Sequence, residues 1–149
     1  MTLFVDADAF PNVLKEILLR FVLKRSIPTR FIANKKIAIP SSSFISMEIA
    51  PQGADEADNL IASACQRGDI VITADIPLAD RIVSRGAIGL DPRGTIYSTE
   101  NIKSLLAMRN LMQELRDGGE ITGGPSAIGE KEKRAFADAL NALLQKKNI

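Results

Sequence analysis

The sequence contains no histidine and a single cysteine, Cys65, among its 149 residues. The absence of histidine excludes Ser-His-Asp and Cys-His catalysis as well as zinc bound by histidine. One cysteine cannot form an internal disulfide or a thiolate zinc site, and it favours a reducing, cytoplasmic location. Chemistry in this chain must therefore use carboxylates, amides, hydroxyls, Lys, Arg or the backbone. A site made only of carboxylates favours hard cations such as Mg²⁺ or Mn²⁺.

Aromatic residues and long apolar runs are also scarce. Aromatic side chains make up 5% of the sequence, with no tryptophan and one tyrosine, so platforms for stacking nucleic-acid bases are few. The run "ILLRFVL" is interrupted by Arg20 and is too short to span a bilayer, so we expect no membrane association. Asp6 and Asp8 stand where a signal peptide would carry positive charge, so we expect none.

The charges that are present are segregated along the chain. The net charge is only +1, but residues 15–36 hold seven basic side chains and one acidic one, whereas residues 48–80 hold seven acidic and one basic. One interpretation is an acidic pocket beside a basic surface, and the other is two solvated helix faces of opposite sign. The sequence does not indicate an oligomeric state.

Short apolar runs alternate with amphipathic stretches, which predicts a parallel α/β sheet of about five strands with helices on both faces. The expected strands are residues 2–5, 29–33, 44–50, 69–73 and 87–90, with a further edge strand at 95–97. The expected helices are residues 11–24, 54–68, 76–85, 101–119 and 132–147. We interpret 1–149 as one domain, with a core over about 1–98 and a helical C-terminal extension over about 99–149.

Acidic side chains follow two of the expected strands. Asp6 and Asp8 come after the first strand, and Asp75 comes after the strand at 69–73. If these strands are neighbours where the strand order reverses, the carboxylates converge at the carboxyl edge of the sheet. Converging carboxylates repel each other unless a cation neutralises them. One or two Mg²⁺ or Mn²⁺ ions would do so, and would also favour hydrolysis of a phosphodiester.

Each acid also has a purely structural explanation. Asp55 can cap the helix at 54–68 with Asp58 in its first turn, and Asp75 can cap the helix at 76–85. Asp8 can close a turn, and Asp80 can lie on a solvated helix face. The convergence of several acids, rather than any one of them, supports a site.

Three stretches of the sequence resemble a known family. They are "FVDADAFPN", "QGADEADNLIASACQRGDIVITADIPLADRIVSRGAIGLDPRG" and "GGPSAIGEKEKRAFADAL". Together they resemble the YaiI/YqxD family of uncharacterised bacterial proteins, which is in turn similar to the PIN-like nucleases. The second resemblance implies a PIN-like fold and a metal-dependent nuclease that acts on RNA rather than DNA.

The PIN-like resemblance also implies roles for individual acids. It makes Asp6 and Asp75 the central metal ligands and catalytic residues, and Asp80 the last ligand. The acid from the middle helix would be Asp55 or Asp58, with Glu56 also open. Asp8 has no counterpart and would lie beside the ligands, and the C-terminal extension has no obvious counterpart either.

Two other functions remain open on the sequence. "LFVDADAF" also resembles the first motif of haloacid-dehalogenase-type phosphatases, with Asp6 as nucleophile, Asp8 as acid/base, and Asp75 and Asp80 as magnesium ligands. That interpretation lacks a clearly placed lysine and gives no role to the acids of "GADEADN". The third function is nucleic-acid binding without catalysis, through segment 15–36 and the arginines. In either nucleic-acid function, the expected phosphate contacts are Arg81, Arg85 and Arg93.

A glycine-rich stretch, Gly123–Gly129, precedes the last expected helix. Gly124 and Gly129 have the separation of a phosphate-binding loop, but Glu130 stands where that loop requires lysine, and no strand precedes it. We therefore interpret the stretch as a connector whose further role is open. Cys65 falls on the apolar face of its expected helix and is interpreted as a core residue.

Overall fold

One six-stranded sheet, in the order β3-β2-β1-β4-β5-β6, organises the chain. The computed structural model describes residues 1–122 and 127–149. Its strands are β1 (Leu3–Asp6), β2 (Thr29–Ala33), β3 (Ile45–Ile49), β4 (Ile70–Ile72), β5 (Ile88–Leu90) and β6 (Ile96–Tyr97). β1 to β5 are parallel, and β6 is an antiparallel edge strand. The predicted parallel α/β sheet of about five strands is confirmed in β1 to β5, and the edge strand expected at 95–97 is a sixth strand, which runs antiparallel.

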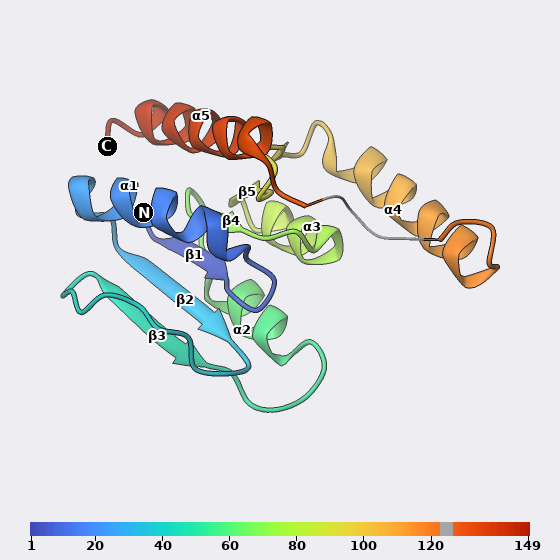
Figure 1. The fold of residues 1–149 in the computed structure, drawn as a ribbon, viewed down its shortest axis with the longest axis horizontal. Helices are drawn as coiled ribbons and strands as arrows, with labels where there is room; N and C mark the ends of the chain where they lie inside the picture. The colour runs from blue at the N-terminus through green and yellow to red at the C-terminus, as the bar shows by residue number, and fades with distance from the viewer. Residues whose placement is uncertain (123–126) are drawn as a thin grey trace.

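Helices cover both faces of the sheet, as predicted. The described helices are α1 (Asn12–Arg25), α2 (Glu56–Ala64), α3 (Ile76–Ser84), α4 (Ile102–Asp117) and α5 (Glu130–Lys146). Buried side chains of α1 and α5 share one apolar core, and those of α2 and α3 share the other. Figure 1 shows α1 and α5 together above the sheet, with α2 and α3 on its other side.

The side chains of β1 alternate between these two cores. Leu3 and Val5 are fully buried against the α1/α5 layer, and Phe4 packs against the α2/α3 layer. A strand covered on both faces forms a continuous apolar run, which is why its burial was evident from sequence. Asp6, the next residue, falls on the same face as Phe4 because successive side chains of a strand point in opposite directions.

The strand order reverses between β1 and β4. Val5 pairs with Ile72 in β4, while Asp6 pairs with Ile32 in β2. A crevice at such a reversal is where open α/β sheets bind their ligands. The structure thus confirms that the first strand and the strand at 69–73 are neighbours, and it brings Asp6 close to the residues that follow β4.

α2 is shorter than predicted. It ends at Ala64 rather than near Gly68, because Cys65 adopts an extended conformation. The guanidinium of Arg85 donates to the carbonyl oxygens of Cys65 (3.1 Å) and Ser63 (3.4 Å). These hydrogen bonds satisfy carbonyls at the end of α2 that would otherwise lack partners. Cys65 is fully buried, as expected of a core residue.

The last helix belongs to the packed core. Phe136, Leu140 and Leu144 of α5 are fully buried against the sheet. α5 begins at Glu130, two residues before the predicted start, and the Glu132 carboxylate accepts the Gly129 N–H at 3.2 Å. α5 therefore completes one of the two helical layers.

α4 behaves differently from the other helices. Ile102, its first residue, is buried, but every later side chain of α4 is at least partly exposed. The helix extends away from the sheet in Figure 1. The predicted glycine-rich connector after α4 includes residues 123–126, which lie outside the described residues. Within the described ranges, no helix is long and apolar enough to cross a membrane.

Candidate metal and phosphate site

Asp6 is a buried carboxylate at the carboxyl end of β1. Only 7% of the residue is exposed, and its Oδ2 accepts a hydrogen bond of 2.8 Å from the Thr73 hydroxyl. Burial raises the pKa of Asp6, and the charges of Asp75 and Asp8 raise it further, while the Thr73 hydrogen bond acts in the opposite direction. The protein therefore holds Asp6 in an environment that disfavours its negative charge.

Thr73 connects Asp6 to Asp75. Its hydroxyl donates to Asp6, and the same oxygen accepts the Asp75 backbone N–H at 3.0 Å. The Asp75 carboxylate accepts the Leu78 N–H at 3.0 Å, so Asp75 caps α3 as the structural explanation expected. This cap uses one oxygen of the Asp75 carboxylate and leaves the other available. Asp75 can therefore cap α3 and also take part in the site.

Asp58, in the first turn of α2, is the third member of the acidic group. Burial raises its pKa to about 7, together with the charge of Asp75, a hydrogen bond with Asp75, and the charges of Asp6 and Asp55. A carboxyl with this pKa is partly protonated near neutral pH. Asp58 is therefore the middle-helix acid that interacts with both Asp6 and Asp75.

Asp55 and Glu56 contribute less directly. Asp55 occupies the N-cap position of α2 with a φ of 66°, and its side chain makes no capping hydrogen bond, contrary to the expectation from sequence. A non-glycine residue in this left-handed region costs free energy and is uncommon. Asp55 lines the same pocket as Asp58 and Asp75, whereas Glu56 does not.

The acidic pocket, as we call this cavity of about 460 Å³, combines acids with basic and amide side chains. It is lined by Asp55, Asp58, Asp75, Asn59, Arg81 and Arg109, with Ala54, Pro77 and Leu78. The Arg81 guanidinium donates to the Asn59 side-chain oxygen at 2.9 Å. Arg109 comes from α4, and sequence reasoning missed it because no pattern predicts where α4 lies relative to α3. The two arginines place positive charge beside the carboxylates.

Two predicted acids neither line the acidic pocket nor raise the pKa of Asp58. Asp80, on α3, accepts a hydrogen bond from the Lys103 ammonium at 2.8 Å and does not line the acidic pocket. Asp8 accepts the Asn34 backbone N–H at 2.8 Å and lines a different pocket. The structure therefore brings together Asp6, Asp58 and Asp75, with Asp55 at the edge of the group.

Of the three predicted arginines, one lines the acidic pocket and two do not. Arg81 lines the acidic pocket, whereas Arg85 binds the carbonyl oxygens at the end of α2. Arg93 lies 3.8 Å from the Glu132 carboxylate of α5 and so connects the loop after β5 to that helix. Arg81 is thus the member of the predicted trio that is placed to meet a ligand of the acidic pocket.

The donor set fits a hard cation by its chemistry. Asp6, Asp58 and Asp75 offer carboxylate oxygens, the ligands that Mg²⁺ and Mn²⁺ prefer. Among the described side chains, no group of three or more His, Cys, Asp or Glu is placed closely enough to hold a metal ion. The carboxylates are therefore neighbours rather than a closed cage. The proton that Asp58 retains near pH 7 would have to leave when a cation binds.

Comparison with known proteins shows to which family the chain belongs. Residues 4–146 match the family described as "Uncharacterized BCR, YaiI/YqxD family". The chain belongs to the YaiI/YqxD family. The resemblance noted from sequence motifs is thereby confirmed, whereas the more distant PIN-like resemblance stays a prediction.

Full-length relatives agree with the YaiI/YqxD assignment. A UPF0178 protein of a Sulfurovum species is 58% identical over 146 residues, which cover 98% of this chain and 99% of that protein. A UPF0178 protein of a Nitratiruptor species is 55% identical over 146 residues, covering 98% and 96%. One of Sulfurimonas denitrificans is 49% identical over 149 residues, covering 100% and 99%. No solved structure matches the chain significantly.

Proposed function

We propose that this member of the YaiI/YqxD family is a nuclease that depends on Mg²⁺ or Mn²⁺ and hydrolyses phosphodiester bonds, with RNA preferred to DNA. The observation that carries the proposal is that Asp6, Asp58 and Asp75 meet between β1 and β4, where the strand order reverses. Burial and the charge of Asp75 raise the pKa of both Asp6 and Asp58 there, an arrangement that costs stability and is typical of functional sites.

In this proposal Asp6, Asp58 and Asp75 would hold one or two cations after their side chains draw closer together than in the described structure, and Asp55 lies at the edge of the site. A cation held there would neutralise the carboxylates and would supply Lewis-acid chemistry for hydrolysis of a phosphodiester. Thr73 holds Asp6 in place through its hydroxyl. Arg81 and Arg109 supply the positive charge that binds the neighbouring phosphates of the strand.

The position of Asp58 favours the nuclease over the phosphatase alternative. The phosphatase mechanism uses Asp6 and Asp8 and gives no role to an acid from α2. Asp58 nevertheless interacts with both Asp6 and Asp75. Asp8 instead accepts the backbone N–H of Asn34 and lines a different pocket. A covalent phosphate trapped on Asp6 would establish the phosphatase instead.

The test is a cleavage assay on single-stranded RNA and single-stranded DNA with added Mn²⁺. It compares the native protein with Asp6→Asn and Asp75→Asn, and with Asp138→Asn as a control on the exposed surface of α5. Asparagine can still accept from Thr73 at position 6, and it caps helices as well as aspartate at position 75, so both variants should fold.

We expect the two site variants to lose activity by about 100-fold or more, because each removes a ligand charge from the site, while Asp138→Asn stays fully active. RNA should be cleaved faster than DNA. Equal residual activity in all four proteins would indicate a contaminating nuclease and would contradict the proposed function. Salt-sensitive RNA binding without any cleavage would favour the non-catalytic alternative.

A further inference from the structure

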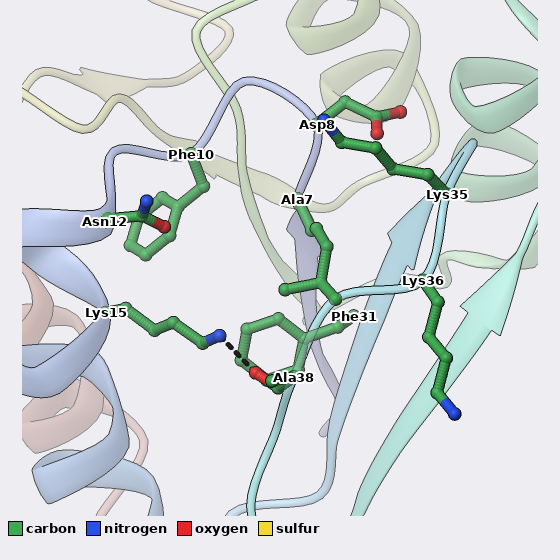
Figure 2. Close-up of a pocket in the computed structure, with 10 residues that line it drawn as sticks. Ala7, Asp8, Phe10, Asn12, Lys15, Phe31, Lys35, Lys36 and Ala38 are labelled. Atoms are coloured by element: carbon green, nitrogen blue, oxygen red, sulfur yellow. Dashed lines mark hydrogen bonds between the residues drawn. The ribbon is translucent and has the colours of Figure 1, made fainter.

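A second pocket adjoins the site on the opposite face of the sheet. The connection between β2 and β3 is an irregular loop without a helix. This loop and α1 together cover that end of the sheet. A cavity of about 430 Å³ lies there, between the start of α1 and the loop. We call it the lysine pocket and define it by Ala7, Phe10, Phe31, Lys15, Lys35 and Lys36, which line it with Asp8, Asn12, Ile37 and Ala38 (Figure 2).

The lysine pocket begins directly after Asp6, because Ala7, the next residue of the chain, lines it. Asp6 faces the α2/α3 layer with Thr73, and Ala7 belongs to the core on the α1/α5 side. Asp6 is the last residue of β1 and Ala7 follows it, so consecutive residues of the chain contribute to the acidic group and to the lysine pocket.

The lining of the lysine pocket carries three lysines against one carboxylate, Asp8. Lys15 is half-buried, and its ammonium donates to the carbonyl oxygen of Ala38 (Figure 2). Lys15, Lys35 and Lys36 form no salt bridge within the part of the chain that the structure describes. An ammonium has three donors, so Lys15 keeps two for a ligand. Lys35 lies with Asp8 at the upper end of the view in Figure 2, whereas the ammonium of Lys36 points away from Phe31 and Ala38.

An aromatic and apolar wall faces these charges. Phe31 is 1% exposed, and Phe10 is fixed by its contact with Phe136, with ring centroids 5.9 Å apart. The volume falls within the range of about 300–1,000 Å³ usual for small-ligand sites. A small inorganic anion would leave the apolar wall unused, and an apolar ligand would leave the lysines unpaired. A ring joined to a phosphate satisfies both parts.

We infer that the lysine pocket binds one nucleotide unit of the substrate strand, with the phosphate at Lys15 and Lys35 and the base against the Phe10 side. The inference rests on the proposed function, because it assigns a neighbouring nucleotide of the same substrate to this pocket. It gives a role to the part of segment 15–36 that lines this pocket, which holds three of its seven basic residues. It also makes the cleaved bond one that lies near a bound nucleotide.

The test measures binding in EDTA, where cleavage cannot occur. Adenosine 5′-monophosphate, adenosine and inorganic phosphate are titrated by calorimetry into the native protein, Lys15→Gln, Lys35→Gln and Asp58→Asn. Lys131→Gln, on the exposed surface of α5, is the matched control. We expect the monophosphate to bind more tightly than adenosine or phosphate, and each pocket substitution to weaken it by about tenfold. Asp58→Asn and Lys131→Gln should leave it unchanged.

Several outcomes would overturn the inference. These are the absence of monophosphate binding at millimolar concentration, binding that neither lysine substitution weakens, and phosphate binding as tight as that of the nucleotide. RNA cleavage that requires Asp6 but keeps its native KM in Lys15→Gln and Lys35→Gln would also overturn it, while the proposed function would stand. Monophosphate binding of the expected pattern without any cleavage under Mn²⁺ would contradict the proposed function and leave the pocket assignment in place.

Discussion

Replacing Asp58 with asparagine should stabilise the metal-free protein while removing a proposed metal ligand. The folded state raises the pKa of Asp58 from 3.8 to about 7. At a pH above both values this corresponds to about 4 kcal/mol of lost folding free energy. Asp58 is only partly buried, so solvent screening reduces the cost, and we expect about 1–2 kcal/mol. The favourable effect of its charge near the start of α2, about 0.5 kcal/mol, is smaller.

The sign of this effect determines its pH dependence. Because the folded-state pKa is raised, the carboxyl favours folding fully below pH 3.8, and this contribution is lost as the pH rises through about 7. Asparagine has no carboxyl to ionise, so Asp58→Asn does not lose stability at this site as the pH rises. Its advantage over the native protein should therefore be greatest above pH 7 and should fall toward zero near pH 4.

Thermal unfolding in EDTA at pH 8 and pH 4 measures the difference. For a chain of this length, about 1–2 kcal/mol raises the Tm by about 2–8 °C at pH 8. Asp138→Asn, on the exposed surface of α5, is the control and should leave the Tm unchanged. A lower Tm for Asp58→Asn at pH 8, or a shift that is equal at both pH values, would refute the reasoning about charge repulsion in the site.

Further predictions concern the same site and the packing of α5. Apparent Mn²⁺ affinity, measured by calorimetry, should rise about tenfold per pH unit up to about pH 7 and then level off, because Asp58 must release its proton; a flat profile would exclude Asp58 as a ligand. Thr73→Val should lower the free energy of unfolding at pH 7, measured in urea, by about 1–3 kcal/mol, because the buried Asp6 carboxylate loses its donor; an unchanged value would show that Asp6 finds another donor. Gly94→Ala should cost about 2–4 kcal/mol, because φ is +98° and a Cβ there would lie 2.8 Å from the Ala135 backbone of α5; a native Tm would contradict this packing.

The alternation of apolar runs and amphipathic stretches was enough to predict the sheet. β1 and β4 are covered on both faces, so their residues form short continuous apolar runs that are distinct from the helical pattern. That β1 and β4 are neighbours was a condition of the sequence argument rather than a prediction, because no residue of either strand indicates the strand order. Helix ends were less predictable, because α2 ends where Arg85, a residue twenty positions away, binds its carbonyl groups.

The site was predictable only in part, for a related reason. Asp6 and Asp75 follow strands whose order determines their meeting, so their convergence was predicted only on the condition that these two strands are neighbours. Which α2 acid, Asp58 or Glu56, contributes to the site depends on which side of α2 faces the crevice. The pairing of Asp80 with Lys103 depends on how α4 packs against α3. Arg109 carries no local signal at all. Contacts made by side chains from distant segments are therefore what the sequence could not provide.

Direct counting of bound Mn²⁺ by electron paramagnetic resonance tests the central claim, that these carboxylates form a metal site. The native protein is compared with Asp58→Asn and Asp138→Asn at pH 7.5, where Asp58 has largely lost its proton once a cation competes for it. The account predicts one or two tightly bound ions in the native protein and in Asp138→Asn, and at least one fewer in Asp58→Asn. Equal numbers of ions with equal affinity in all three proteins would contradict it.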